Sequence, residues 1–284
     1  MTSTRLPTKK AITLSKIYLG NICLGTIYLG TICLASVVGS LPFVPSAFAQ
    51  YGLGLSKSAG SGGATRGSLP QITMLVPEDG AKTLASRPTF YWYIAPPEIA
   101  PTSLTTLPKR DDGTNSFKIT FILRDSNQLS AKSVFAAEGK ADKSGLYKFT
   151  LPEGAPELVA GKLQRWQIRW QTSGSQVDVN AAIRRDDDPV VLKAIAEAKD
   201  DLQQARIYAK NAYWYDAINA YTNWLSKNPK DDVARTERND LLKEGFKTHS
   251  AFSKELEGNF TKLLSKLDES KSATSIVLQP KNRR

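Results

Sequence analysis

The sequence predicts an α+β protein in which a β-sandwich is followed by a short helical region, and three observations support this class. Short runs of alternating hydrophobic and polar residues fill residues 70–185. Asp188 followed by Pro189 is a typical helix start, and residues 186–268 then carry apolar residues at helical spacing. An apolar leader precedes both regions. We therefore expect an exported protein with a β part and an α part.

The leader, residues 1–49, has the order of a secretory signal peptide. Basic residues come first, an uncharged apolar run follows over 17–38, and Ala47-Phe48-Ala49 supplies the small residues of a cleavage site. We expect cleavage after Ala49 and a periplasmic or extracellular protein. The apolar run is long enough to span a bilayer, so an inner-membrane anchor formed by residues 17–38 is the alternative. We expect no other contact with a membrane.

The formal net charge of +11 does not predict nucleic-acid binding. Residues 70–188 hold fifteen basic and fourteen acidic residues, so the β region is nearly balanced. Much of the excess lies in the leader, in a Gly/Ser-rich linker over 50–69, and in the basic tail 269–284, which we expect to be disordered. A basic face for a duplex is therefore not indicated.

The residue inventory argues against an enzyme. Both cysteines, Cys23 and Cys33, lie in the leader, and His249 is the only histidine of the chain. Thiolate chemistry, a conventional zinc site and a Ser-His-Asp triad therefore lack their usual residues. The three aspartates of 186–188 suit helix capping better than calcium, because adjacent carboxylates project in different directions. We expect no catalytic residue, no metal and no cofactor.

The β region is expected to contain about seven strands bounded by turn residues. They are ITMLVP (72–77), TFYWYI (89–94), FKITFILRD (117–125), KSVFAA (132–137), LYKFTLP (146–152), RWQIRWQ (165–171) and QVDVNAAI (176–183). Alternation along three of them places one row of large apolar side chains inside. These rows are Phe90, Trp92 and Ile94; Phe117, Ile119, Phe121 and Leu123; and Trp166, Ile168 and Trp170.

The same alternation sends Tyr91 and Tyr93 to the opposite side of their strand. One interpretation is that a linker or the following helical segment covers them, since tyrosine is often partly buried. The other is an exposed aromatic pair that stacks on a sugar ring or on a partner side chain. Both remain open at this point.

A second candidate surface follows if strand 117–124 neighbours strand 165–171. Their outward residues would then share one face, namely Lys118, Thr120, Arg124, Arg165, Gln167 and Arg169. This basic, amide-rich face predicts binding to an anionic envelope polymer. The alternative is an outer sheet face whose charges are solvated and serve solubility.

The helical region begins with an apolar stripe at steps of three and four residues, which predicts one helix from residue 189 to about 212. A second helix is predicted up to Pro229. Ala205, Tyr208, Ala217, Tyr221 and Pro229 fall at the spacing of a tetratricopeptide unit, so the pair resembles one such hairpin. Two further helices are expected, one through residues 241–242 and one through residues 252–264.

Five segments together carry a family resemblance. They are SLPQITMLVP, RPTFYWYIAPP, GKLQRWQIRW, AAIRR and ARIYAKNAYWYDAINAY, between Ser68 and Gly245. They resemble a family of secreted proteins, best known from cyanobacteria, that is catalogued as domain of unknown function number 928. The resemblance implies an envelope address and supplies no catalytic residue. Gln164 departs from it, because the family more often has a tyrosine there that could make a corner hydrogen bond.

The β half separately resembles an immunoglobulin or fibronectin type III module, through PTFYW early and AGKLQRWQIRW late. That resemblance concerns the fold alone. For function, we expect a non-catalytic interaction or scaffold module that binds another envelope protein through the helical hairpin. The alternative is a module that binds glycan or an anionic envelope polymer.

Overall fold

The computed structural model describes residues 51–55, 72–95, 117–141, 143–171, 176–247, 254–269 and 272–281, all of which lie in the compact unit Ser46–Arg284. The predicted leader 1–49, most of the predicted linker 50–69 and His249 lie outside the described residues. Within the described residues, no helix combines the length and the hydrophobicity needed to cross a membrane.

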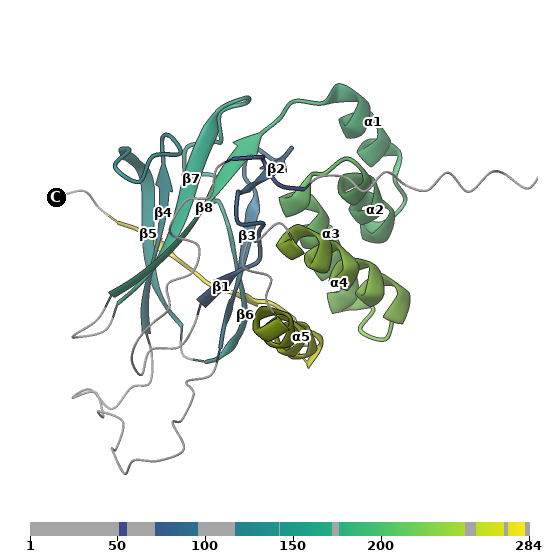
Figure 1. Cartoon of the computed structure of the whole chain (residues 1–284). Coiled ribbons are helices and arrows are strands. Elements are labelled where there is room, and N and C mark those ends of the chain that lie inside the picture. The colour runs from purple at the N-terminus through teal and green to yellow at the C-terminus, as the bar shows by residue number, and fades with distance from the viewer. Residues whose placement is uncertain are drawn as a thin grey trace, which may run out of the picture. The chain divides into compact units, whose positions relative to one another are not determined.

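The chain is α+β, with most strands first and the helices later, as predicted (Figure 1). The strands before the helices are β1 (Ile72–Met74), β2 (Ala81–Thr83), β3 (Thr89–Ile94), β4 (Phe117–Arg124), β5 (Ser133–Ala141), β6 (Gly145–Thr150), β7 (Leu163–Gln171) and β8 (Gln176–Arg185). Each of the seven predicted segments overlaps one of them, although β5, β6, β7 and β8 extend beyond the predicted bounds. The unpredicted strand is β2, three residues long and too short to display a period.

The strands form two packed sheets. The smaller sheet has the order β1-β3-β6-β9 and the larger sheet the order β10-β5-β4-β7-β8-β2. Rings from both sheets meet between them, with Phe90 of β3 centred 4.7 Å from Trp166 of β7 and 4.9 Å from Phe121 of β4. The three predicted inner rows are confirmed wherever their side chains are described, since each of those residues is at most 1% exposed. Period-two alternation therefore identified this core.

The end of the chain differs from the expected disordered tail. Residues 272–281 include β9 (Thr274–Ser275) and β10 (Gln279–Pro280), and each extends one of the sheets. Ile276 and Leu278 are buried. The tail is ordered because these two apolar side chains have a place to pack, which its polar composition concealed.

The helices are α1 (Pro189–Glu197), α2 (Asp201–Lys210), α3 (Trp214–Lys227), α4 (Asp232–Lys247) and α5 (Lys254–Glu269). Asp188 caps α1 as predicted, accepting hydrogen bonds from the backbone amides of Val190 and Val191. The prediction of a single helix from 189 to 212 is wrong, because the helix is interrupted between α1 and α2. Asp200 caps α2 by accepting from the amide of Gln203, 2.8 Å away.

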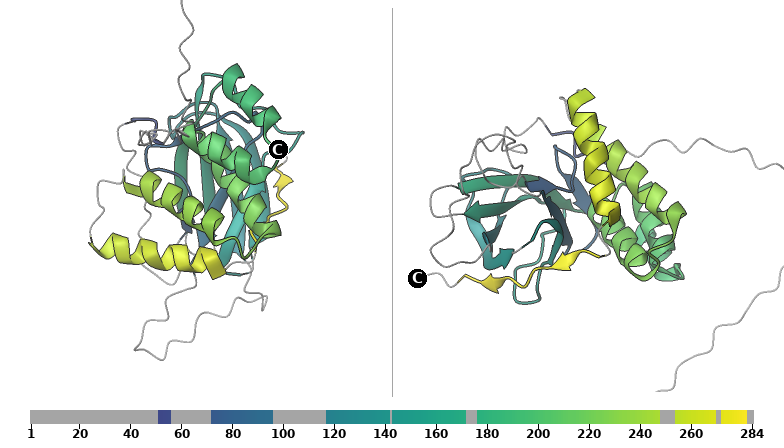
Figure 2. Two further views of the ribbon diagram at one scale, coloured as in Figure 1. Left: turned by 90° about the vertical axis from the view of Figure 1, so that its right-hand side faces the viewer. Right: turned by 90° about the horizontal axis from the view of Figure 1, so that it is seen from below.

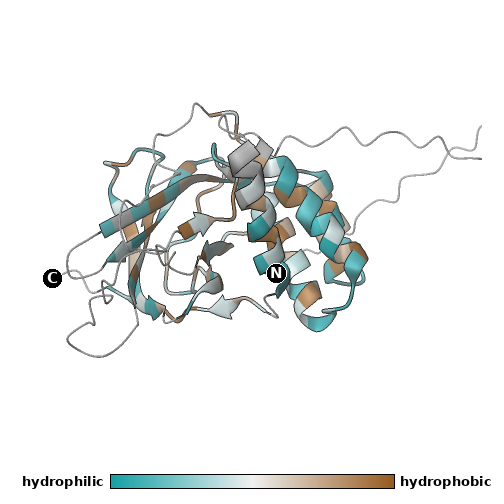
Figure 3. Ribbon diagram, turned by 60° about the horizontal axis from the view of Figure 1, so that its bottom comes forward, coloured by the Kyte–Doolittle hydropathy of each residue, from teal (hydrophilic) through white to brown (hydrophobic). Residues whose placement is uncertain are grey.

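Helix α3 is the part of the helical region that packs most closely on the sheets. Trp214 is fully buried, and its indole Nε1 donates to the carbonyl of Leu75, 2.9 Å away. The hydroxyl of Tyr215 accepts from Trp166 Nε1 at 2.8 Å and lies 3.3 Å from the carbonyl oxygen of Ala182, to which it donates. One hydrophobic cluster thus continues from the sheets into the helices. Figure 3 shows hydrophobic and hydrophilic residues together on the helices, as expected for helices that bury one side.

Gln164 performs the role that a corner tyrosine was expected to perform. Its side chain is buried, and its Oε1 accepts a hydrogen bond from the amide of Val159, 3.0 Å away. The approach to β7 is therefore tied back to the preceding loop without a tyrosine.

Candidate functional site

Tyr91 and Tyr93 are covered by helices, so the interpretation as an exposed stacking pair is wrong. Tyr91 is 2% exposed and Tyr93 is 6% exposed. The Tyr91 hydroxyl donates to Asn219 Oδ1 of α3 at 2.8 Å, and burial raises its pKa. Burial also raises the pKa of Tyr93, whose hydroxyl lies in the field of Lys266 on α5. The two rings form the floor on which α3 and α5 pack.

The structure brings the predicted basic residues onto one outer face of the larger sheet. Strand β4 pairs with β7, with Arg124 opposite Arg165, Ile122 opposite Gln167 and Thr120 opposite Arg169. The predicted neighbourhood of these strands is therefore confirmed. Arg165 and Gln167 are nevertheless 4% and 3% exposed, because neighbouring side chains and the loop after β4 lie over them.

Two of the positive charges on this face already have carboxylate partners. Arg169 makes a two-pronged contact with Asp178 of β8, at 2.9 and 3.1 Å. Burial alone would raise the pKa of Asp178, but hydrogen bonds led by the one from Arg169 hold it below its ordinary value. Lys118 pairs with Glu138 of β5 at 3.0 Å. This half of the face is close to neutral.

Arg124 and Arg165 hold the β4–β5 loop against the sheet. Arg165 donates from Nε to the carbonyl of Asn127 at 2.6 Å, from Nη2 to the Oδ1 atom of the same residue at 2.8 Å, and also to Asn180. Arg124 donates to the carbonyl of Ala131 at 2.8 Å. Burial, and secondarily the nearby Arg124 charge, lower the pKa of Arg165. Two guanidinium groups thus lie close together among neutral acceptors.

A buried carboxylate links the helices to the sheets, and sequence reasoning missed it. Asp216, in the first turn of α3, accepts from Thr83 Oγ1 at 3.1 Å and from the amide of Leu84 at 2.9 Å. Burial raises its pKa to about 6, against the opposing effect of these hydrogen bonds. A charged residue directly after three aromatic residues, in YWYDAI, was the available signal. Asp216 serves the attachment of α3, since both of its contacts are internal.

The helical region also holds the chain's own segment 51–55. The ring of Tyr51 lies edge-on against Trp214, with centroids 5.5 Å apart. Burial, and then the Glu244 carboxylate of α4, raise the pKa of Tyr51. The amide of Gly54 donates to Asp79 at 2.7 Å. A segment with one aromatic side chain is therefore bound beside α3 and α4.

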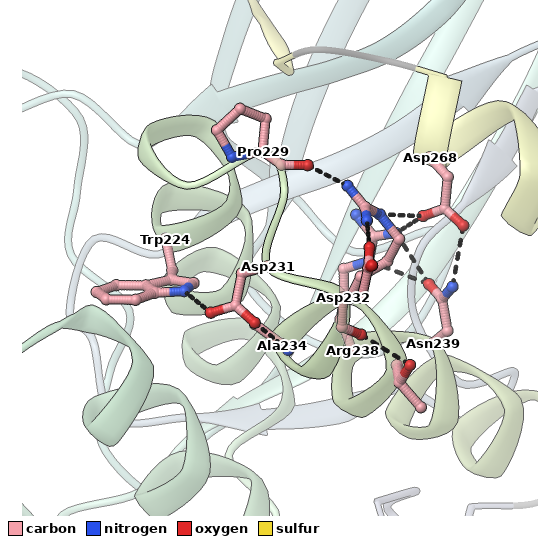
Figure 4. A network of polar contacts seen from close by, with 10 residues as sticks. Trp224, Pro229, Asp231, Asp232, Ala234, Arg238, Asn239 and Asp268 are labelled. Carbon is pink, nitrogen blue, oxygen red and sulfur yellow. Dashed lines mark hydrogen bonds and ion pairs between the residues drawn. The ribbon is translucent and has the colours of Figure 1, made fainter.

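Polar contacts fix the outer helices to each other. Arg206 of α2 contacts Glu237 of α4 at 2.9 Å, with the two side chains 47% and 32% exposed. Between α4 and α5, Arg238 and Asn239 converge on Asp268 (Figure 4). Arg238 is 7% exposed, and this burial lowers the pKa of its guanidinium group. The Asp268 carboxylate opposes the shift without cancelling it. These contacts join α2 to α4 and α4 to α5.

A depression near the start of α1 is lined by the aspartates of 186–188, by residues 160–161, by Pro189 and by Tyr213. Asp186 contacts Arg184, and Asp188 is occupied as the helix cap and as the acceptor of the Tyr213 hydroxyl. Among the residues that the structure describes, no group of three or more His, Cys, Asp and Glu side chains could hold a metal ion.

These features define a class of protein, namely an α+β unit in which a helical layer is fixed to two packed sheets. The family model described as Domain of Unknown Function (DUF928) matches residues 59–255, and the chain belongs to this family. The match confirms the family to which the RPTFYWY and YWYDAI segments pointed. No curated protein matches the chain.

Proposed function

We propose that the protein is an exported, non-catalytic module of the cell envelope that recruits another protein through its helical region. In this proposal the two sheets are an immunoglobulin- or fibronectin-like sandwich that acts as a scaffold, and α2 and α3 are a tetratricopeptide-like hairpin. The signal-peptide-like leader supports export. The inventory of one histidine and no cysteine after the leader supports a non-catalytic role.

The observation that carries this proposal is the packing of Tyr51 against the helical region. Segment 51–55 packs one aromatic ring against Trp214, and the backbone amide of Gly54 donates to Asp79. Tyrosine and tryptophan are typical anchors of protein interfaces because they combine a large apolar area with a polar tip. The helical region therefore already binds one segment with an aromatic anchor, and this segment belongs to the same chain. We infer that residues 51–55 and the adjoining surfaces of α3 and α4 form the edge of the partner interface.

A matched pair of variants tests this proposal in the native host. Arg206→Ala with Glu237→Ala removes a partly exposed ion pair from the helices, and Arg169→Ala with Asp178→Ala removes one from the larger sheet. Co-isolation of a stoichiometric partner with the full chain should fall about tenfold for the helical pair, corresponding to ~1.4 kcal/mol, and stay unchanged for the sheet pair. Tyr51→Ala should also lower the yield of the co-isolated partner, because residues 51–55 form the edge of the proposed interface.

The reverse dependence, in which only the sheet pair matters, would contradict the helical interface. Urea melts of both double variants are the control. The sheet pair is partly exposed, so its variant should unfold close to the wild type. The helical variant should lose about 1 kcal/mol, because Glu237 also accepts from the hydroxyl of Tyr221.

An anionic envelope polymer is the second candidate ligand, and one observation favours it. In the described part of the chain, the buried Nε of Arg124 has no hydrogen-bond partner, and Arg165 lies beside it. A bound anion would offset the repulsion between the two guanidinium groups. Retention on purified anionic envelope polysaccharide should then weaken with salt and with Arg124→Gln, which keeps a polar side chain of similar length. Binding that ignores both changes rejects this candidate.

A further inference from the structure

The C-terminal strap, defined here as residues 272–281, crosses from the edge of one sheet to the edge of the other. Its strand β9 pairs parallel with β6, with Thr274 opposite Tyr147 and Ser275 opposite Lys148. Its strand β10 pairs antiparallel with β5, with Gln279 opposite Glu138. Figure 2 shows the yellow strap running along this side of the sheets. The strap thus covers the outer edges of β5 and β6.

The strap is seated by alternate side chains and by its backbone. Ile276 and Leu278 are 6% and 7% exposed, whereas Val277 between them is 76% exposed. The amide of Ile276 donates to the carbonyl of Lys148 at 3.0 Å. The amide of Lys281 donates to the carbonyl of Ala136 at 2.9 Å. This is how a strand is added to a sheet, with main-chain hydrogen bonds for affinity and pockets for alternate side chains.

The β5 edge is shaped for this occupant. A Cβ at Gly139 would lie 2.6 Å from Leu278 Cδ2, so glycine leaves the space that Leu278 fills. Glu138 contacts Lys281 at 2.8 Å as well as Lys118 at 3.0 Å. We call the outer edges of β5 and β6 that the strap covers the seam. These contacts give the seam a preference for two apolar side chains, as in Ile276 and Leu278, followed by a lysine, as in Lys281.

The strap is held by short pairings. Each ladder contains only two residue pairs, and the strap comes after α5 as the last described part of the chain. A vacated seam would present two unpaired strand edges, which attract any matching strand. An element held by short pairings, with an acceptor seam that fits it, is well suited to exchange between identical chains.

We propose that the seam is a strand-acceptor site for a second copy of this chain, whose residues 272–281 replace the acceptor's own strap. The exchanged strap makes the contacts described above, now between two molecules. The exposed side of Val277 remains on the outside of the joined pair. This interaction uses the side of the sheets and is independent of the interface proposed for the helices.

Single cysteines test the exchange in the full chain, in which Cys23→Ser and Cys33→Ser remove the two native cysteines. Glu138 and Gln279 are opposite in register, and such pairs have Cα atoms about 4.5–5.5 Å apart, within reach of a disulfide. Glu138→Cys and Gln279→Cys chains are mixed, incubated at high concentration and oxidised. The expected product is a disulfide-linked heterodimer, at least about tenfold above the yield with Val277→Cys, whose thiol would face solvent.

The double variant Glu138→Cys with Gln279→Cys is the internal reference, and it should form its disulfide within one chain. If it does so while the mixture yields no heterodimer above the Val277→Cys control, the strap is a fixed internal strand and the proposal is overturned. If the double variant forms no disulfide, the seating of the strap itself is wrong and the proposal falls with it. Adding Gly139→Leu to the Glu138→Cys chain should abolish the heterodimer by filling the place of Leu278.

Discussion

Replacing Asp216 with asparagine should change how the stability of this protein depends on pH. The Asp216 carboxylate is 9% exposed and accepts hydrogen bonds from Thr83 and Leu84. An asparagine can keep both contacts, because its carbonyl accepts from the Leu84 amide while its NH₂ group donates to the Thr83 hydroxyl. The variant therefore removes the titration of this group and retains its attachment to the sheets.

The size of the effect follows from the pKa of Asp216. Burial raises that pKa from the ordinary value of 3.8 to about 6 in the folded protein. Each pH unit of separation between the folded and unfolded values is worth about 1.4 kcal/mol, so the effect amounts to ~3 kcal/mol. Because the folded pKa is the higher one, this contribution is complete below the unfolded-state pKa and is lost as the pH rises through about 6.

The assay is urea unfolding of the wild type and of Asp216→Asn between about pH 4 and about pH 7. The free energy of unfolding of the wild type should fall by about 2–2.5 kcal/mol relative to that of the variant over this range, because part of the ~3 kcal/mol is already lost at about pH 4, just above the unfolded-state pKa. Carboxylates with lowered pKa values, such as Asp178, act equally in both proteins and cancel. Asp240→Asn is the control, since that side chain is 63% exposed. Parallel curves for the wild type and Asp216→Asn would refute a buried titrating carboxylate.

Three further substitutions test the packing of the helices, each by urea or thermal unfolding. Gly245→Ala should destabilise by ~1–2 kcal/mol, because the new methyl group meets the buried Trp214 ring and this outweighs the gain of about 1 kcal/mol in helix propensity. Tyr91→Phe should cost about 1 kcal/mol through the lost hydrogen bond to α3, so an unchanged melt would contradict that contact. Asp268→Asn should cost ~3 kcal/mol and speed proteolysis at α5, because Arg238 would keep its charge without a carboxylate.

The sequence was informative wherever a local period decided the structure. Trp92, Phe121 and Trp166 were placed inside because strand side chains alternate, and each is fully buried. The start of α1 was predictable because Asp188 and Pro189 are capping residues that act over one turn. The break before α2 was also encoded, in Asp200 and Gln203, but a continuing apolar stripe concealed it. Two local signals competed there, and the cap prevailed over the periodicity.

The candidate surfaces were predicted less well, because exposure depends on elements distant in sequence. Alternation sent Tyr91 away from the core between the sheets, but only the position of α3 determines that the ring meets Asn219. The outward direction of Arg165 was also correct, and its burial by the loop of Asn127 was not predictable from strand spacing. Asp216 illustrates the same limit, since its partners lie more than a hundred residues away in the chain.

The distribution of buried polar contacts argues that the helices and sheets move as one body. Trp214, Tyr215, Asp216 and Asn219 all lie within the first two turns of α3, and each makes a hydrogen bond to the sheets or to the loops beside them. Breaking any one leaves a buried polar group without a partner, which costs about 1–3 kcal/mol. In the proposed interaction a partner at Tyr51 would bind to helices that are fixed to the sheets, whereas the strap is held by ladders of only two residue pairs each and would be expected to open at lower cost.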